Sequence, residues 1–139
     1  MMIRPFQPAD EFAVVQLWES AGLTRSWNNP VKDIQRKLSV QREWFLVGLV
    51  DERIMASVMA GYDGHRGWIN YLAIDPNYQR QGYGRVMMAS AERLLLEAGC
   101  PKINLQIRQD NVAAIAFYQN IGFSEDAVIS FGKRLILDE

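Results

Sequence analysis

The residues best suited to bind a charged ligand form the stretch Gln79-Arg80-Gln81-Gly82-Tyr83-Gly84-Arg85, which directly precedes a long predicted helix. The first backbone N–H groups of a helix have no partner within it, and together with the positive end of the helix dipole they attract anions. Glycines in such a loop let the main chain approach a phosphate closely, and Arg80 and Arg85 add positive charge. The stretch therefore predicts a pyrophosphate site, although two glycines before a helix also fit a simple tight turn.

Two common nucleotide-binding signatures are absent from this stretch. The Walker pattern G-x-x-x-x-G-K-S/T does not occur, and the Rossmann pattern G-x-G-x-x-G fails because Gly84 is followed by Arg85, Val86 and Met87. This stretch therefore lacks the usual sequence signatures of ATP-binding and NAD-binding proteins.

A second chemically suggestive stretch is the predicted helix from Asn111 to Ile121. Asn111 and Tyr118 are seven residues apart, so their side chains project from nearly one face of the helix. Small residues between them keep the helix surface low enough for an extended ligand to lie close: Ala113, Ala114 and Ala116. Two structural alternatives are open, in which Asn111 is only an N-cap and Tyr118 is a core tyrosine whose hydroxyl bonds a carbonyl.

Both stretches resemble signatures of the GNAT acetyltransferases. Gln79 to Gly84 is similar to the R/Q-x-x-G-x-G/A coenzyme A motif of that family, and the second signature, N-x-x-A-x-x-x-Y-x-x-x-G-F, is matched by Asn111, Ala114, Tyr118, Gly122 and Phe123. Further stretches resemble a small bacterial member of the family: 25–30, 62–67, 99–103 and 132–136. The resemblance implies a single N-acetyltransferase domain over residues 1–139 that passes the acetyl group of acetyl-coenzyme A to an amine.

The resemblance also implies how the cosubstrate is held. In the family a bulge in the strand equivalent to Trp68–Ile74 splays it from its parallel neighbour, and the pantetheine arm binds in the gap. Backbone groups of Leu72, Ala73 and Ile74 are then expected to contact it, and one N–H to stabilise the oxyanion. The expected cosubstrate-binding set is completed by Gln79, Arg80, Gln81, Gly82, Tyr83, Gly84, Arg85, Asn111, Ala114 and Tyr118.

The sequence defines the residues for the two proton transfers of the reaction less fully than those for cosubstrate binding. A tyrosine with an ordinary pKa of about 10 is protonated at neutral pH, so Tyr118 is the expected general acid for the leaving thiolate. The common family glutamate is replaced by Gln106, which cannot accept a proton, and the remaining candidate bases are Asp63, His65, Asp75 or ordered water. The alternative for the Asp63 to Arg66 stretch is a turn that merely closes a hairpin.

Acceptor recognition is expected between the first two helices, in the loop from Thr24 to Asn28. Trp27 is the first candidate for a pocket wall, with Asp63 and His65 as further candidates, although a tryptophan that only packs the helical pair fits the sequence equally well. The resemblance implies that the acceptor is a small-molecule or peptide amine. Two other functions stay open. The chain could be a non-catalytic acyl-coenzyme A sensor, or an interaction protein that keeps the fold without binding a cosubstrate.

The elements that position these residues predict an α/β (α+β) fold of the GNAT type. Helices are expected from Asp10, Asn29, Gly84 and Asn111. Strands are expected at 2–6, 44–50, 54–62, 68–74 and 102–108, and one or two closing strands at Ala127–Leu135. The sheet is therefore predicted to be mixed and mostly antiparallel, with six to seven strands, four flanking helices and one central parallel pair.

Composition limits the partners and the compartment. A chain of 139 residues fits one domain, and its net charge of −1 provides no broad cationic surface for nucleic acid. No apolar run approaches the roughly 20 residues of a membrane span. With a single cysteine, Cys100, and no secretory leader after Met1, a cytoplasmic protein is expected. We expect no metal, and either a monomer or a homodimer.

Overall fold

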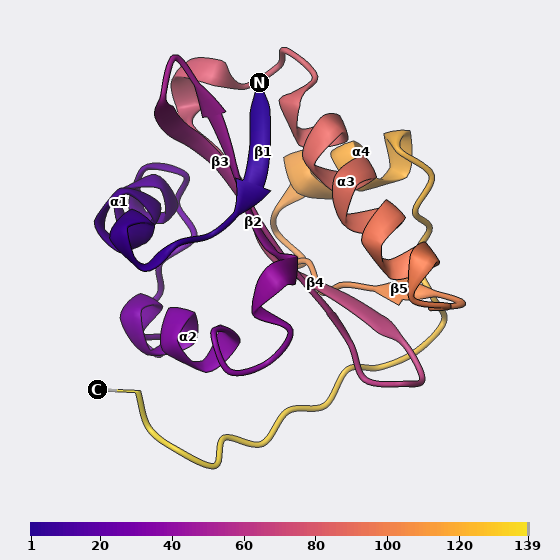
Figure 1. The fold of residues 1–139 in the computed structure, drawn as a ribbon. Helices are drawn as coiled ribbons and strands as arrows, with labels where there is room; N and C mark the ends of the chain where they lie inside the picture. The colour runs from indigo at the N-terminus through magenta and orange to yellow at the C-terminus, as the bar shows by residue number, and fades with distance from the viewer. Residues whose placement is uncertain (139) are drawn as a thin grey trace.

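The computed structural model describes residues 1–138 and is built around one twisted sheet (Figure 1). Within these residues the sheet has five strands and is accompanied by four α-helices. The strands are β1 Met2–Pro5, β2 Phe45–Val50, β3 Arg53–Tyr62, β4 Gly67–Ile74 and β5 Ile103–Asn104. The helices are α1 Glu11–Ser20, α2 Pro30–Lys37, α3 Tyr83–Glu97 and α4 Val112–Asn120.

The strands follow the chain in the order β1-β2-β3-β4-β5. β1 to β4 form an antiparallel meander, whereas β4 and β5 are parallel. Two parallel neighbouring strands require a long crossover connection, and α3 lies in the connection between β4 and β5. The prediction of a mixed, mostly antiparallel sheet with one parallel pair is therefore confirmed.

The helices cover both faces of the sheet, with α1 and α2 on one side and α3 and α4 on the other (Figure 1). Alternate residues of β2 face the two layers. Phe45 and Val47 belong to the core beneath α1 and α2, whereas Leu46 belongs to the core beneath α3. Because β2 and β3 are buried on both faces, their sequences are apolar runs with little polar alternation.

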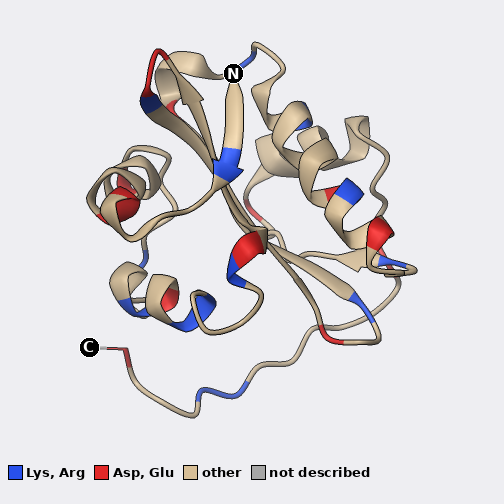
Figure 2. Cartoon of the chain, viewed as in Figure 1, with Lys and Arg blue, Asp and Glu red and all other residues tan. Residues whose placement is uncertain are grey.

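The predicted start of the second helix is confirmed in detail. The Asn29 side chain accepts a hydrogen bond of 3.1 Å from the Lys32 backbone N–H, and Pro30 occupies the first helical position. Acidic and basic side chains are interspersed over the elements (Figure 2). No helix in the part of the chain that the structure describes is long and apolar enough to cross a membrane.

β4 contains a bulge near its C-terminal end. Ser57 of β3 pairs with Ala73, but Met59, two residues on, pairs with Asn70, so β4 has one residue more than its partner. Tyr71 lies in this interval with a φ of +52°, a left-handed conformation that is uncommon for a non-glycine residue. A bulge of this kind bends the strand locally and increases its twist.

Two strand predictions require correction. The strand expected over Lys102–Arg108 is limited to Ile103–Asn104, and Ala127–Leu135 forms no strand, so residues 1–138 contain five strands and not six to seven. Residues 124–138 are largely exposed and extended, and no backbone hydrogen bond described for them ties them to the sheet. An alternating sequence indicates which residues would share a face of a strand, but the strand forms only where another edge supplies hydrogen bonds.

Candidate functional site

The entrance of α3 presents unpaired backbone donors. Gly82 is its N-cap with a φ of +85°, no side chain caps the helix, and the first hydrogen bond runs from Val86 N–H to the Gly82 carbonyl at 3.2 Å. Within residues 1–138 the N–H groups of the preceding three positions, 83–85, have no protein acceptor. Arg80 is also left-handed, with a φ of +62°. Left-handed residues next to a helix start turn successive N–H groups into one concave anion site.

The two glycines of this loop serve different purposes. A Cβ on Gly82 would meet no atom within 4 Å, so the position needs glycine for its positive φ. A Cβ on Gly84 would lie 3.0 Å from Cε1 and Cζ of Phe117 and 3.9 Å from Cγ1 of Ile74. Gly84 therefore lets the end of β4, the start of α3 and the middle of α4 meet at one point.

The other residues of the loop surround this entrance. Arg80 and Arg85 are exposed, and Arg85 Nη2 lies 3.5 Å from the Asn120 carbonyl at the end of α4. Gln79 donates from Nε2 to the Ile74 carbonyl at 3.2 Å, and Gln81 is exposed. The ring of Tyr83 meets Tyr78 edge-on at 6.2 Å. Both arginines thus add positive charge where the helix donors are unpaired.

The gap between β4 and β5 opens directly below this entrance. The two strands pair at Gly67 with Ile103 and at Trp68 with Asn104, and within residues 1–138 the remainder of β4 has no strand neighbour on that side. Asp75 N–H donates to the Met55 carbonyl of β3 at 2.8 Å. Because successive N–H groups of a strand point to opposite edges, those of Ile74 and Leu72 face the gap.

Tyr118 lies in the same apolar layer as Leu72 and Ile74. Its ring packs edge-on against Phe117 at 5.0 Å and Phe123 at 5.5 Å. Burial raises the pKa of the Tyr118 hydroxyl to about 12, so the group is protonated at neutral pH. In the described chain the hydroxyl has no hydrogen-bond partner, unlike a core tyrosine bonded to a carbonyl.

Asn111 holds the start of α4 in place. Its Oδ1 accepts a hydrogen bond of 3.1 Å from the N–H of Ala114, so these two residues of the second signature are bonded to one another. The N-cap interpretation of Asn111 is confirmed by this contact. Its contribution to the site is to fix the helix that carries Phe117 and Tyr118.

Asp63 and His65 lie at the opposite end of β4 from the gap. Asp63 Oδ1 accepts hydrogen bonds from the backbone N–H groups of His65 at 2.8 Å and Arg66 at 2.7 Å, which closes the β3–β4 hairpin. These bonds, that from Arg66 first, lower the pKa of the Asp63 carboxyl. Leu72 is five residues beyond the start of β4, or about 16 Å at about 3.3 Å per residue. The structure therefore does not bring Asp63 and His65 to the gap.

Asp75, the remaining side-chain candidate for the base, and Gln106, which replaces the family glutamate, both make hydrogen bonds. The Asp75 carboxylate accepts a 2.9 Å hydrogen bond from the Asn77 N–H, which starts the short turn Pro76–Tyr78. The Gln106 amide donates to the hydroxyl of Ser130.

Trp27 does not simply pack the helical pair. Its side chain is 47% exposed, and the Arg108 guanidinium lies 5.5 Å from the centre of its ring. The loop between α1 and α2 is thereby joined to the chain that leaves β5. Sequence reasoning did not identify Arg108 as a partner of Trp27, because their contact depends on how far β5 diverges from β4.

Sequence reasoning also missed the residues that shape the bulge. Ser57, which is completely buried in β3, donates from Oγ to the Tyr71 carbonyl at 2.9 Å and accepts from the Trp18 indole at 2.9 Å. The Tyr71 ring stacks on Trp18 with centroids 3.8 Å apart. A single serine within the apolar run Ile54–Ala60 was the available signal.

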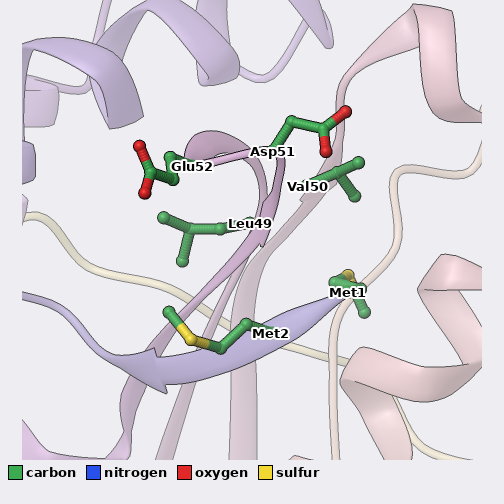
Figure 3. A pocket seen from close by; sticks show the side chains of 6 residues that line it. All are labelled: Met1, Met2, Leu49, Val50, Asp51 and Glu52. Carbon is green, nitrogen blue, oxygen red and sulfur yellow. The ribbon is translucent and has the colours of Figure 1, made fainter.

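Two surface hollows lie elsewhere. One, of about 430 Å³, is lined by Met1, Met2, Leu49, Val50, Asp51 and Glu52 (Figure 3). The other, of about 470 Å³, lies between α1 and the β2–β3 turn and includes Arg4 and Asp10, which are bonded to one another at 2.7 Å. Neither contains a residue of the α3 entrance or of the Leu72–Ile74 edge. We place the candidate site at the gap because the unpaired donors converge there.

Known proteins resemble this chain in sequence and in fold. The sequence model of the acetyltransferase (GNAT) family matches residues 12–123. An acetyltransferase from Yersinia pestis is 44% identical over 139 residues, covering 100% of this chain and 99% of that protein. Ard1 from Thermoplasma volcanium superimposes with a TM-score of 0.79 at 27% identity, over 91% of this chain and 84% of that one. The complex of AAC(6')-Iy with the bisubstrate analogue CoA-S-monomethyl-acetylneamine superimposes with a TM-score of 0.77 at 16% identity, over 96% and 97%.

Proposed function

The chain belongs to the acetyltransferase (GNAT) family, and we propose that it transfers the acetyl group of acetyl-coenzyme A to an amine by direct attack in a ternary complex. The observation that supports this most directly is the meeting of Ile74, Gly84 and Phe117. This contact brings the start of α3, the end of β4 and the helix that carries Tyr118 together, which supports a single site at the gap. Acetyl-coenzyme A supplies the activated acyl group, as a thioester.

The α3 entrance has the chemistry to hold a pyrophosphate. The backbone N–H groups of Tyr83, Gly84 and Arg85 would donate to its oxygens, supported by the positive end of the helix dipole. The guanidinium groups of Arg80 and Arg85 would add charge-assisted contacts from the loop and the first turn. Gly82 keeps this surface free of a side chain.

The open edge of β4 has the chemistry to hold the pantetheine and to stabilise the oxyanion. The N–H groups of Leu72 and Ile74 face the gap, and that of Leu72 follows the bulge directly. A donor held rigidly in this position lowers the barrier of acyl transfer, and removal of one such donor typically costs about 2.7–4 kcal/mol. The Ser57 contact that fixes the bulge therefore supports the transfer step indirectly.

Tyr118 is proposed to protonate the departing thiolate. Its hydroxyl is protonated at neutral pH and has no partner within residues 1–138, so it can donate to a ligand. The attacking amine must also lose a proton, and Gln106 cannot take it. Asp63 and His65 precede β4, whose start lies about 16 Å along the strand from Leu72, and the Asp75 carboxylate caps the turn after β4. We therefore propose that water at the gap removes this proton.

The acceptor is proposed to approach from the side of Trp27. This side chain and Arg108 join the α1–α2 loop to the chain after β5 and so border the side of the gap away from α3. An amine acceptor, either a small molecule or a peptide, is expected. In AAC(6')-Iy the bisubstrate analogue joins coenzyme A to acetylneamine.

The alternative is a sensor that binds acyl-coenzyme A without turning it over. An unpaired, protonated Tyr118 hydroxyl favours catalysis, because a purely structural tyrosine would gain by bonding a carbonyl. The test is a screen of amines with acetyl-coenzyme A in which released thiol is measured. Turnover with at least one amine, lost in Tyr118→Phe, is expected, whereas tight binding of acetyl-coenzyme A without turnover across the amine classes would identify a sensor.

A further inference from the structure

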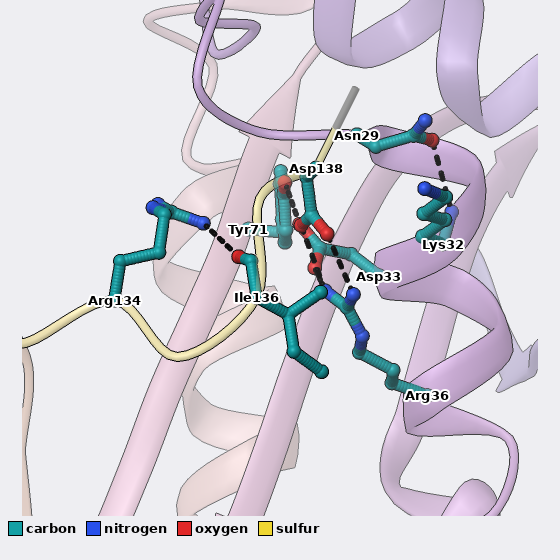
Figure 4. Close-up of polar contacts among 8 residues, drawn as sticks. All are labelled: Asn29, Lys32, Asp33, Arg36, Tyr71, Arg134, Ile136 and Asp138. Carbon is teal, nitrogen blue, oxygen red and sulfur yellow. Dashed lines mark hydrogen bonds and ion pairs between the residues drawn. The ribbon is translucent and has the colours of Figure 1, made fainter.

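A chain of polar contacts leads from the bulge of β4 to α2. The Tyr71 hydroxyl donates to Asp33 Oδ2 at 2.7 Å. Asp33 Oδ1 accepts from Arg36 Nη1 at 3.2 Å, and the Arg36 guanidinium bonds both carboxylate oxygens of Asp138, at 2.8 and 2.6 Å (Figure 4). We call these four side chains the α2 network. It lies on the face of the sheet that α1 and α2 cover, where Tyr71 packs against the core.

The peptide unit between Tyr71 and Leu72 carries the N–H group that is proposed to stabilise the oxyanion. The carbonyl of this unit belongs to Tyr71 and accepts a hydrogen bond of 2.9 Å from Ser57 Oγ. In a planar trans peptide the N–H points away from the carbonyl, so this contact directs the Leu72 N–H away from β3, toward the gap. The direction of the Leu72 N–H therefore depends on how firmly Tyr71 is held.

Tyr71 needs this support because its backbone conformation is unfavourable. A φ of +52° is an outlier for a bulky residue, and such conformations persist only where the surrounding contacts hold them. The Tyr71 ring stacks on Trp18 with centroids 3.8 Å apart, which limits its motion perpendicular to the ring plane. Stacking alone leaves the ring free to slide within its own plane. The hydrogen bond from the hydroxyl to Asp33 removes that freedom.

Asp33 is itself fixed in position. Asn29 caps α2, and the Asp33 N–H donates to the Asn29 carbonyl at 3.0 Å as a helical hydrogen bond. Asp33 thus lies in the first turn of α2, where the positive end of the helix dipole favours a carboxylate. Its two oxygens have separate partners, Tyr71 and Arg36. The carboxylate therefore offers the phenol an acceptor with a defined position.

We propose that Asp33 is a positioning residue for acyl transfer, which holds the bulge of β4 through the Tyr71 phenol and thereby the direction of the Leu72 N–H. This inference rests on the proposed function, because it assigns a role in the same transfer step. Both oxygens of Asp33 are engaged within the protein, which favours this role over that of a base or an acceptor ligand. The helix that follows the expected acceptor loop thus also holds the oxyanion donor.

The first test compares kcat with coenzyme A affinity in variants of the full chain, with an amine that the wild type acetylates. Tyr71→Phe keeps the ring on Trp18 and removes only the hydroxyl, whereas Asp33→Ala removes the acceptor of that hydroxyl. Each variant should lower kcat by about tenfold and change the Kd of coenzyme A by less than about twofold, because a displaced oxyanion donor weakens the transition state more than ground-state binding.

The double variant shows whether Asp33 acts through Tyr71. In the Tyr71→Phe background Asp33→Ala should cause no further loss of kcat, because the bond between the two side chains is already absent. Asp126→Ala is the matched control, since it removes an ion pair with Lys102 outside the α2 network and should leave kcat unchanged. Losses that multiply in the double variant, or single variants that turn over as the wild type does, would overturn the proposal.

The Leu72 amide provides a readout that does not depend on turnover. In amide NMR spectra of isotope-labelled protein, Asp33→Ala should shift the Leu72 signal in the wild-type background but not in the Tyr71→Phe background. A merely structural role of Asp33 would change the amides of α2 and leave Leu72 unaffected, which would overturn the proposal. A shifted Leu72 signal in a chain that acetylates no amine would instead support the link from Asp33 to Leu72 and contradict the proposed function, so the two failures are distinguishable.

Discussion

Ser57 and Tyr71 are joined by a hydrogen bond that determines the shape of β4 at the candidate site. The serine hydroxyl donates to the Tyr71 carbonyl at 2.9 Å and accepts from the Trp18 indole, while the Tyr71 phenol donates to Asp33 at 2.7 Å. Burial, followed by the hydrogen bond to Asp33, raises the pKa of the Tyr71 phenol. Tyr71, whose φ is positive, is therefore held through its backbone, its ring and its hydroxyl. This arrangement fixes the bulge that precedes the Leu72 N–H.

Ser57→Ala should therefore reduce both stability and turnover. The change leaves the buried Trp18 indole N–H and the Tyr71 carbonyl without their partner, at about 1–3 kcal/mol for each unsatisfied group. Because the Leu72 N–H then loses its fixed direction, kcat should fall more than coenzyme A affinity. Denaturant unfolding and steady-state kinetics measure the two effects. Ser124→Ala, at an exposed site, is the control, and unchanged stability of Ser57→Ala would show that the bulge does not depend on this contact.

Gly82→Ala should weaken coenzyme A binding more than it affects the fold. A left-handed alanine costs about 1–2 kcal/mol, and Gly22→Ala is a matched control because Gly22 also has a positive φ and open space around its Cβ. Both variants should lose similar stability. Only Gly82→Ala should show a smaller thermal shift with coenzyme A, which in the wild type corresponds to about 2.7 kcal/mol at a hundredfold excess over Kd. Equal thermal shifts with coenzyme A in both variants would indicate that the loop is only a tight turn.

Gly84→Ala should destabilise the contact between α3 and α4. The added methyl would lie 3.0 Å from the Phe117 ring, and overpacking of this kind costs about 1–3 kcal/mol. The smaller side chain in Phe117→Leu should recover part of this loss in the double variant. A double-mutant cycle of unfolding free energies measures the coupling, and strictly additive losses would mean that the two residues do not meet in solution.

Tyr118→Phe should lower kcat by about 10²-fold, with coenzyme A affinity nearly unchanged, because the ring is kept and only the general acid is lost. The pKa of about 12 also predicts an effect on alkaline stability. A group whose pKa is raised on folding stabilises the fold below its unfolded value of about 10 and loses that contribution as pH rises to about 12. Tyr118→Phe should therefore lose less stability than the wild type between pH 10 and 12. A wild-type rate with chemistry limiting would remove Tyr118 from the mechanism.

Much of the fold could be predicted because it depends on local patterns. The Asn29-Pro30 start of α2 and the long amphipathic α3 follow from cap residues and from apolar periodicity, which act within a few residues of the chain. The order strand, helix, strand around α3 likewise required a parallel pair. The glycine loop and the Asn111 to Phe123 spacing identified the family for the same reason, since each motif lies within one short segment.

Only the tertiary structure decided where the remaining groups lie. The two glycines are alike in sequence, yet Gly82 is needed for its backbone angle and Gly84 for its distance from Phe117, which is 33 residues away. His65 and Asp63 are suitable bases by type, but the length of β4 separates them from the gap. The strand expected within Ala127–Leu135 does not form, because a strand needs a partner edge that the local sequence does not specify. Pairing between distant segments depends on their positions in space, and local sequence does not encode those positions.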